Sequence, residues 1–96
     1  MFAWDARKAA GNFNKHGLSF EEAATVFADP DGLEWEDLEH GHNENRFKRL
    51  GFSVKGRIII LVYSNRRMKD GKETIRIITA RQASPKECEA NKKRES

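Results

Sequence analysis

The sequence has few of the features that secreted or membrane proteins need. Its single cysteine, Cys88, can form no disulfide within the chain and supports no cysteine-based zinc site. The longest apolar run, residues 58–63, is far shorter than the roughly 20 residues of a membrane-spanning helix. Residues 1–5 lead into charged sequence rather than into an apolar secretion signal. We therefore expect a cytoplasmic protein that does not bind membranes.

The sequence also lacks the motifs of most cofactor-dependent enzymes. It has no glycine-rich phosphate loop, no nucleophile elbow and no spaced metal ligands beyond His40 and His42. These two histidines could share a metal ion, but no third ligand is marked, and the alternative is a pair of solvated loop side chains. We expect neither a metal nor a cofactor.

Charge is divided unevenly along the 96 residues, which are enough for one domain spanning 1–96. Before Arg46 there are three Lys or Arg and ten Asp or Glu residues, a net charge of −7; from Arg46 onward there are 15 and 5, a net charge of +10. The basic half could attract nucleic acid, and it is also a surface that a protein partner could cover. The alternative is solvated surface charge without a partner.

Residues 57–81 give the strongest strand signal. The run 58–63 is apolar on both alternating faces, which predicts a strand in the middle of a sheet, covered on both sides. Asp70 and Gly71 predict a hairpin turn into a second, antiparallel strand over 74–80.

Two helices are marked by residues that suit helix ends. Asp5 as N-cap and Gly17 just past the end predict a helix over 6–16. Ser84 and Glu87 form a capping box that predicts a short, polar C-terminal helix.

A third helix is predicted between these two. Ser19 and Glu22 form another capping box, in which the Ser19 hydroxyl accepts from the Glu22 amide and the Glu22 carboxylate accepts from the Ser19 amide. The helix is expected to run to Ala28. Its sheet-facing residues are predicted to be Phe20, Ala23, Ala24 and Phe27.

The remaining segments complete an α+β fold. Alternating patterns predict a charged edge strand over 32–38 and another strand over 46–53, with a loop over 39–45 between them. The expected architecture is a mainly antiparallel sheet with two N-terminal helices and a short C-terminal helix.

A basic surface without a metal site is compatible with the metal-independent cleavage of RNA. This reaction needs a group that takes the proton of the 2′-hydroxyl, positive charge for the pentacoordinate phosphorane, and a group that protonates the leaving 5′-oxygen. Arginines suit the second task. His40 is the natural proton-transfer group, and Glu44 could act as the base or orient His40.

The sequence resembles the BrnT toxins of bacterial type II toxin–antitoxin pairs, which are RelE-like ribonucleases. The resemblance covers nearly the whole chain. It is carried by Phe2-x-Trp4-Asp5, Lys15-His16-Gly17-Leu18-Ser19-Phe20-Glu21-Glu22-Ala23, Val26-Phe27-x-Asp29-Pro30, His40, Glu44-x-Arg46-Phe47, Leu50-Gly51-x-Ser53, Gly56-Arg57, Val62-Tyr63 and Ile75-Arg76-Ile77-Ile78-Thr79-Ala80-Arg81.

The resemblance implies a RelE-like α+β toxin that cleaves RNA and halts translation. It also implies a cognate ribbon-helix-helix antitoxin, similar to BrnA, through which alone the pair binds operator DNA. Catalytic roles are expected for Arg46, Arg81, His40 and Glu44. RNA contacts are expected for Arg57, Arg66, Arg67, Arg76 and Lys48.

Several of these residues have a structural alternative. Arg57 follows a turn glycine and could simply close a hairpin. Arg76, which we expect to share a strand face with Ile78 and Ala80, could pack its stem and pair with an acid. The chain also departs from RelE-like toxins in having no tyrosine in its last helix, where Asn91 stands instead.

A second function remains open. The chain could be a non-catalytic module that binds nucleic acid or protein and serves as a corepressor subunit. In either case we expect the protein partner to cover the basic face of the sheet, because the opposite charges of the two halves leave that face in need of an anionic neighbour.

Overall fold

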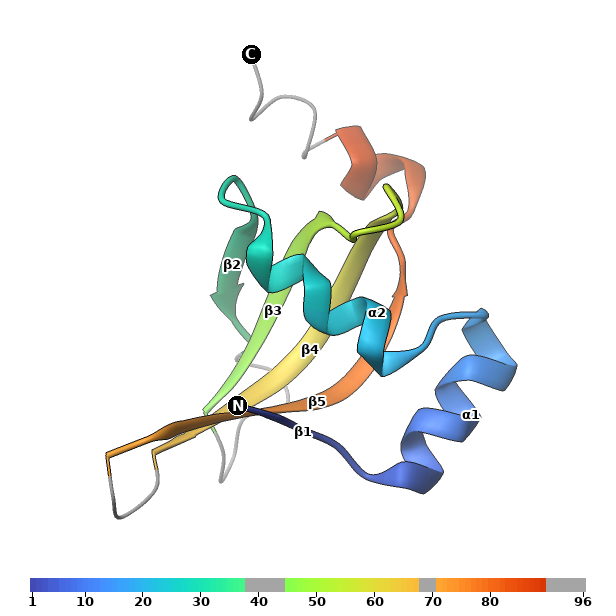
Figure 1. The fold of residues 1–96 in the computed structure, drawn as a ribbon. Coiled ribbons are helices and arrows are strands. Elements are labelled where there is room, and N and C mark those ends of the chain that lie inside the picture. Colours follow the sequence, from blue (N-terminus) through green and yellow to red (C-terminus); the bar gives the residue numbers. More distant parts are fainter. Residues whose placement is uncertain (38–44, 68–70, 90–96) are drawn as a thin grey trace.

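The doubly apolar segment forms the middle strand of a five-stranded sheet, as its sequence predicts. In the computed structural model, which describes residues 1–37, 45–67 and 71–89, the strand order is β1-β5-β4-β3-β2 (Figure 1). The strands are β1 (Phe2–Ala3), β2 (Leu33–Glu36), β3 (Arg46–Phe52), β4 (Ile58–Arg67) and β5 (Glu73–Gln82). Neighbours from β2 to β5 pair antiparallel, and β2 is the predicted edge strand.

Strand β1 was not predicted. Its two residues pair parallel with β5, with Phe2 opposite Ile75 and Ala3 opposite Arg76. Two residues are too few for an alternating pattern, so sequence periodicity cannot reveal this strand.

Helix α1 (Ala6–His16) has the predicted bounds because its end residues act as expected. The Asp5 carboxylate accepts hydrogen bonds from the amides of Arg7 and Lys8, and Gly17 adopts the left-handed conformation with φ of 68°. Helix α2 (Phe20–Ala24) continues as a 3₁₀ helix, η1 (Thr25–Ala28), so the predicted second helix ends at Ala28 but changes its winding on the way.

The capping box at the start of α2 is only half formed. The Ser19 hydroxyl accepts from the Glu22 amide at 3.1 Å, as predicted. The Glu22 carboxylate does not return to Ser19; it accepts hydrogen bonds from Ser53 and Arg57 across the fold. A charged partner on the sheet outcompetes the local amide because charge-assisted hydrogen bonds are stronger.

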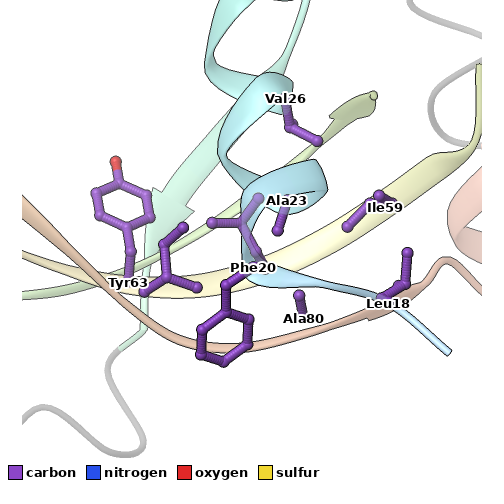
Figure 2. Close-up of a cluster of buried hydrophobic side chains, with 9 residues drawn as sticks. Leu18, Phe20, Ala23, Val26, Ile59, Tyr63 and Ala80 are labelled. Atoms are coloured by element: carbon purple, nitrogen blue, oxygen red, sulfur yellow. The ribbon is translucent and has the colours of Figure 1, made fainter. Parts of the chain in front are cut away.

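The main hydrophobic core lies between α2 and the sheet (Figure 2). Leu18, Phe20 and Ala23 are fully buried there against Ile59 and Leu61 of β4. Ala24 and Phe27 pack against the same cluster, so the predicted sheet-facing set is confirmed. Burial of this apolar surface holds α2 and η1 on one side of the sheet, which we call the helix face.

The opposite side of the sheet, which we call the open face, is defined by the strand register. Directly opposed residues share a face, so Ser64 lies on the same face as Arg46 and Arg76. The register assigns to the open face Leu33, Trp35, Arg46, Lys48, Leu50, Phe52, Ile58, Ile60, Val62, Ser64, Arg66, Thr74, Arg76, Thr79 and Arg81. The sequence predicted that β4 is covered on both of its faces. This is confirmed in part, because Ile60 is buried on the open face but Val62 is only half-buried.

A bulge corrects one expectation about β5. Arg76 was expected to share a face with Ala80. Instead the register shifts beside Val62 and Tyr63, so Ala80 is opposite Leu61 on the helix face and Arg76 is opposite Ser64 on the open face. Strict alternation cannot anticipate an extra residue in one strand.

Residues 85–89 are helical and follow the end of β5 (Figure 1). Both halves of the predicted capping box are present: the Ser84 amide donates to Glu87 at 2.8 Å, and the Glu87 amide donates to the Ser84 hydroxyl at 3.3 Å. None of the helices in the described ranges has the length and apolar character needed to cross a bilayer.

Candidate site on the open face of the sheet

The open face gathers most of the basic side chains that the sequence singled out. Arg46 and Lys48 of β3, Arg66 of β4, and Arg76 and Arg81 of β5 all lie on it. Arg57 does not belong to this group. His40 and Glu44, and the side chain of Arg67, lie outside the described part of the structure.

One row across three strands places two guanidinium groups beside a small side chain. Arg46 of β3 and Arg76 of β5 flank Ser64 of β4 at directly opposed positions. Ser64 is 1% exposed, and its hydroxyl is buried without a hydrogen-bond partner among the described residues. The row therefore sets two cationic side chains on either side of a covered serine, and a pair of guanidinium groups suits a phosphate.

Asp37 extends this row at the sheet edge. Its amide donates to the Arg46 carbonyl at 2.9 Å, which continues the β2–β3 ladder by one residue, and its side chain is buried. Asp37 and Asn45 are the described residues on either side of the segment that holds His40 and Glu44, and both adjoin Arg46.

A groove runs from this row toward the N-terminus. Arg66 and Arg76 line it together with Asp5, and the full set is Met1, Ala3, Trp4, Asp5, Arg66, Thr74 and Arg76. The amides of Lys8 and Arg7 lower the pKa of Asp5, and the positive charge of Arg76 adds to the effect. The groove therefore holds an ionised carboxylate beside two arginines.

Arg81 lies at the other end of the open face. It is opposite Ile60, four residues along β4 from Ser64, which is about 13 Å at the usual rise of a strand. Its guanidinium donates to both carboxylate oxygens of Glu87, at 2.8 and 3.0 Å. The structure therefore does not bring Arg81 together with Arg46.

The ion pair between Arg81 and Glu87 shifts the pKa of both side chains. Hydrogen bonds from Arg81, with a further contribution from the capping bonds with Ser84, lower the pKa of Glu87 to about 2 against the opposing effect of burial. Glu87 in turn raises the pKa of Arg81. Arg81 thus serves the start of the C-terminal helix in this structure.

Arg57 is held on the helix face. Its Nε donates to Glu22 at 2.9 Å and its Nη2 donates to the same carboxylate, whose side chain is 3% exposed. Hydrogen bonds from Arg57 are the main cause that lowers the pKa of Glu22. Arg57 therefore fastens α2 to the sheet, and the RNA contact expected at this residue is left to experiment.

Sequence reasoning missed a second arginine of this kind. Arg49 donates to the carbonyl oxygens of Val26 and Asp29, approaches Glu34 at 3.4 Å and lies over the Phe27 ring. Part of the charge division along the chain is thus internal pairing of the acidic front half with the basic back half.

The sequence analysis also passed over Trp35, Asp37 and Ser64 as site residues. Trp35 and Asp37 share the alternating phase of Leu33, which was visible in the sequence, but the face they occupy follows only from pairing with β3. Ser64 directly follows the apolar run 58–63 and carries no signal of its own in the sequence.

The described residues of the open face are suited to binding anions. Within residues 1–37, 45–67 and 71–89, no three His, Cys, Asp or Glu side chains are grouped so that they could hold a metal ion. Rows of arginine on a rigid sheet provide fixed donors for phosphate oxygens.

The fold and this face define the class of protein. The structure matches the crystal structure of the Brucella abortus ribonuclease toxin BrnT with a TM-score of 0.65 and 23% sequence identity, over 88% of this chain and 97% of that one. The chain is thus a small α+β protein with a toxin fold.

Sequence comparison identifies the family. The model described as "Ribonuclease toxin, BrnT, of type II toxin-antitoxin system" matches residues 4–87, and the chain belongs to this family. Membership implies an RNA substrate and an antitoxin partner. A comparison with curated proteins finds no match.

Proposed function

We propose that this protein is a metal-independent endoribonuclease that binds RNA on the open face and thereby inhibits translation. The observation that supports this most is the row of Arg46, Ser64 and Arg76, with Lys48 and Arg66 on the same face. RNA phosphates are the anions that such a spread of cations fits.

The proposed reaction begins with attack of the 2′-oxygen on the adjacent phosphorus. The base takes the 2′-hydroxyl proton, the bond from phosphorus to the 5′-oxygen breaks, and the acid protonates that oxygen. The products are a 2′,3′-cyclic phosphate and a 5′-hydroxyl. Arg46 and Arg76 stabilise the phosphorane, and His40 and Glu44 are the proposed acid and base.

Arg81 has a different place in this proposal from the one expected from the sequence. It binds RNA beyond the reacting phosphate, because its backbone position is about 13 Å along the sheet from the Arg46 row and its guanidinium is bound to Glu87. Lys48 is proposed to contact a phosphate between these two positions, and Arg66 and Arg67 are proposed to contact phosphates on the far side of the Arg46 row.

The proposed partner is a ribbon-helix-helix antitoxin similar to BrnA, which covers the open face and alone contacts operator DNA. Residues 1–96 are proposed to act as one domain in the cytoplasm, where the RNA of the translation machinery is available. The family name supports a type II antitoxin, and the basic open face supports an acidic contact surface on it.

The test is cleavage of an end-labelled RNA by the purified chain in excess EDTA. We expect cleavage by the wild type and a loss of about 100-fold or more for Arg46→Ala and Arg76→Ala, the size of removing one fixed oxyanion donor. Arg7→Ala, an exposed arginine on α1, is the matched control and should cleave normally.

Two further results bear on the mechanism. A single 2′-deoxy substitution at the cleaved nucleotide should abolish cleavage, because the nucleophile is then missing. If the folded wild type binds RNA without cutting it under any condition, the enzyme proposal fails and the non-catalytic corepressor function replaces it.

A further inference from the structure

Trp35 is an exposed aromatic side chain on the face that carries the cations. Its residue is 42% exposed, on edge strand β2. The large hydrophobic residues that are strongly exposed in the described ranges are Met1, Phe2, Phe13, Trp35 and Val54. Of these, Trp35 is the one that the strand register assigns to the open face.

The neighbours of Trp35 are the proposed phosphate-binding residues. It is directly opposite Lys48 and diagonal to Arg46, and diagonal neighbours across a strand pair lie about 7–8 Å apart. That separation is close to the distance between a nucleotide's base and its phosphate. An indole ring beside two cations on a rigid strand is the usual arrangement for single-stranded nucleic acid.

Tyrosine, another residue type suited to stacking on bases, is unavailable. Tyr63 is the only tyrosine, and its ring is 4% exposed on the helix face, where it packs against Phe27 and Phe47. Its hydroxyl donates to Glu34, and burial followed by Glu34 raises the pKa of Tyr63 well above its ordinary value.

We propose that Trp35 stacks on the base of the nucleotide whose phosphate Arg46 binds, and so positions single-stranded RNA on the open face. The inference rests on the proposed function for its site but concerns binding rather than cleavage. Because every base has an apolar face, stacking adds affinity without strict sequence preference. Trp35 is a positioning residue and takes no part in proton transfer.

The test uses a non-cleavable probe, a 2′-O-methyl RNA dodecamer, together with a series in which one nucleotide at a time is abasic. We expect Trp35→Leu to bind the intact dodecamer about 10-fold more weakly than the wild type, and Trp35→Phe to stay within about threefold. Phe13→Leu removes an aromatic of 56% exposure from α1 and should bind normally.

The abasic series separates stacking from a general structural effect. At one or two positions, loss of the base should weaken the wild type about 10-fold and leave Trp35→Leu unchanged. The salt dependence of binding should be the same for both proteins, because no phosphate contact is removed. The second tryptophan, Trp4, lines the groove beside Arg66 and Arg76, so fluorescence quenching by RNA should be reduced in Trp35→Leu, and any remaining quenching comes from Trp4.

The proposal is overturned if folded Trp35→Leu binds every probe as well as Phe13→Leu does. It is also overturned if the variant loses affinity equally for intact and abasic probes, or loses affinity only for the antitoxin, which would make Trp35 a protein contact. If the wild type does not cleave RNA but still binds it in a base-dependent way, the proposed catalysis is refuted and the stacking proposal is retained. Absence of all RNA binding would refute both.

Discussion

The arginines of the basic half fall into two groups that differ in their surroundings. Arg57 and Arg49 lie on the helix face and bind acceptors from the front half of the chain, including Glu22 and Glu34. Arg46 and Arg76 lie on the open face beside Ser64. Arg49 and Arg57 thus hold the fold together from the helix face, whereas the open-face arginines differ among themselves, since Arg81 pairs with Glu87.

The Glu22 carboxylate is the acceptor on which the helix-face group depends most. It is 3% exposed and accepts from Ser53 at 2.8 Å as well as from Arg57. We expect Glu22→Ala to lower the free energy of unfolding by about 3 kcal/mol, because it leaves donors of a buried pair without an acceptor. Urea unfolding measures this, and Glu21→Ala on the exposed side of α2 should change stability by less than about 0.5 kcal/mol.

The same pair predicts the role of Arg57. Arg57→Ala should also lower the urea midpoint, and combining it with Glu22→Ala should add little further loss, since the two residues share one interaction. RNA binding by the folded Arg57→Ala protein should match the wild type. Normal stability together with weakened RNA binding would instead make Arg57 an RNA contact.

Acid should weaken this pair in a defined direction. Arg57 and Ser53 hold the pKa of Glu22 below its ordinary value of 4.5, against the opposing effect of burial. A carboxyl with a lowered folded pKa stabilises the protein above the unfolded value, and this stabilisation is lost as pH falls through the folded value. The thermal unfolding temperature should therefore decrease less steeply between pH 7 and pH 2 for Glu22→Gln than for the wild type. An equally steep decrease in both proteins would contradict this role.

At the level of elements, the helices were the most predictable parts of the fold. Asp5, Gly17, Ser19 and Ser84 act within a few residues of themselves, so their caps can be read from the sequence. The Glu22 carboxylate could not be predicted, because its partner Arg57 is 35 residues away. Local chemistry is visible in the sequence, and competition from distant residues is not.

Strand pairing shows the same limit. The central position of β4 followed from its composition, but β1 is too short to be recognised and the bulge in β5 reverses the face of Ala80. Trp35 and Ser64 entered the candidate site only through the register. The basic residue types were predictable from sequence, while their division between two faces required the pairing.

The C-terminal helix depends on one carboxylate with two tasks. Glu87 accepts the Ser84 amide and the Arg81 guanidinium, and these bonds lower its pKa to about 2. We expect an NMR titration to place the Glu87 midpoint near pH 2 in the wild type and closer to its ordinary value in Arg81→Ala. Because the folded pKa is the lower one, the helix start is stabilised above about pH 4.5 and loosens as pH falls toward 2.

This titration also separates two roles of Arg81. If Arg81 mainly positions the helix, Glu87→Gln and Arg81→Ala should loosen residues 85–89 to a similar extent in amide hydrogen exchange. An unmoved Glu87 midpoint in Arg81→Ala would show that the pair does not persist in solution and would return Arg81 to the reacting phosphate.

At the scale of the whole molecule, the sheet separates two functions. The helix face buries the core and its internal ion pairs, and the open face presents cations from three adjacent strands. A rigid sheet fixes the spacing of these cations, which favours the proposed binding of RNA on this face.

The salt dependence of RNA binding should show the contribution of each cation of the open face separately. For single-stranded RNA, each phosphate contact contributes a slope of about −0.7 to log K against log salt concentration. We expect Arg76→Ala and Lys48→Ala each to reduce the slope by about that amount, while Arg7→Ala on α1 leaves it unchanged. Equal slopes for all these variants would place the RNA elsewhere on the molecule.

The antitoxin should also cover the open face when it neutralises this protein. An antitoxin with an acidic contact segment gains most by covering the region where RNA phosphates would otherwise bind, so RNA and antitoxin should compete. We expect Lys48→Glu to weaken both interactions at least 10-fold, since it reverses a charge at the centre of the face. Lys8→Glu, on exposed α1, should weaken neither. Titration of labelled RNA into the preformed complex measures the competition, and RNA binding at full affinity with the antitoxin still bound would show that the antitoxin docks on another surface.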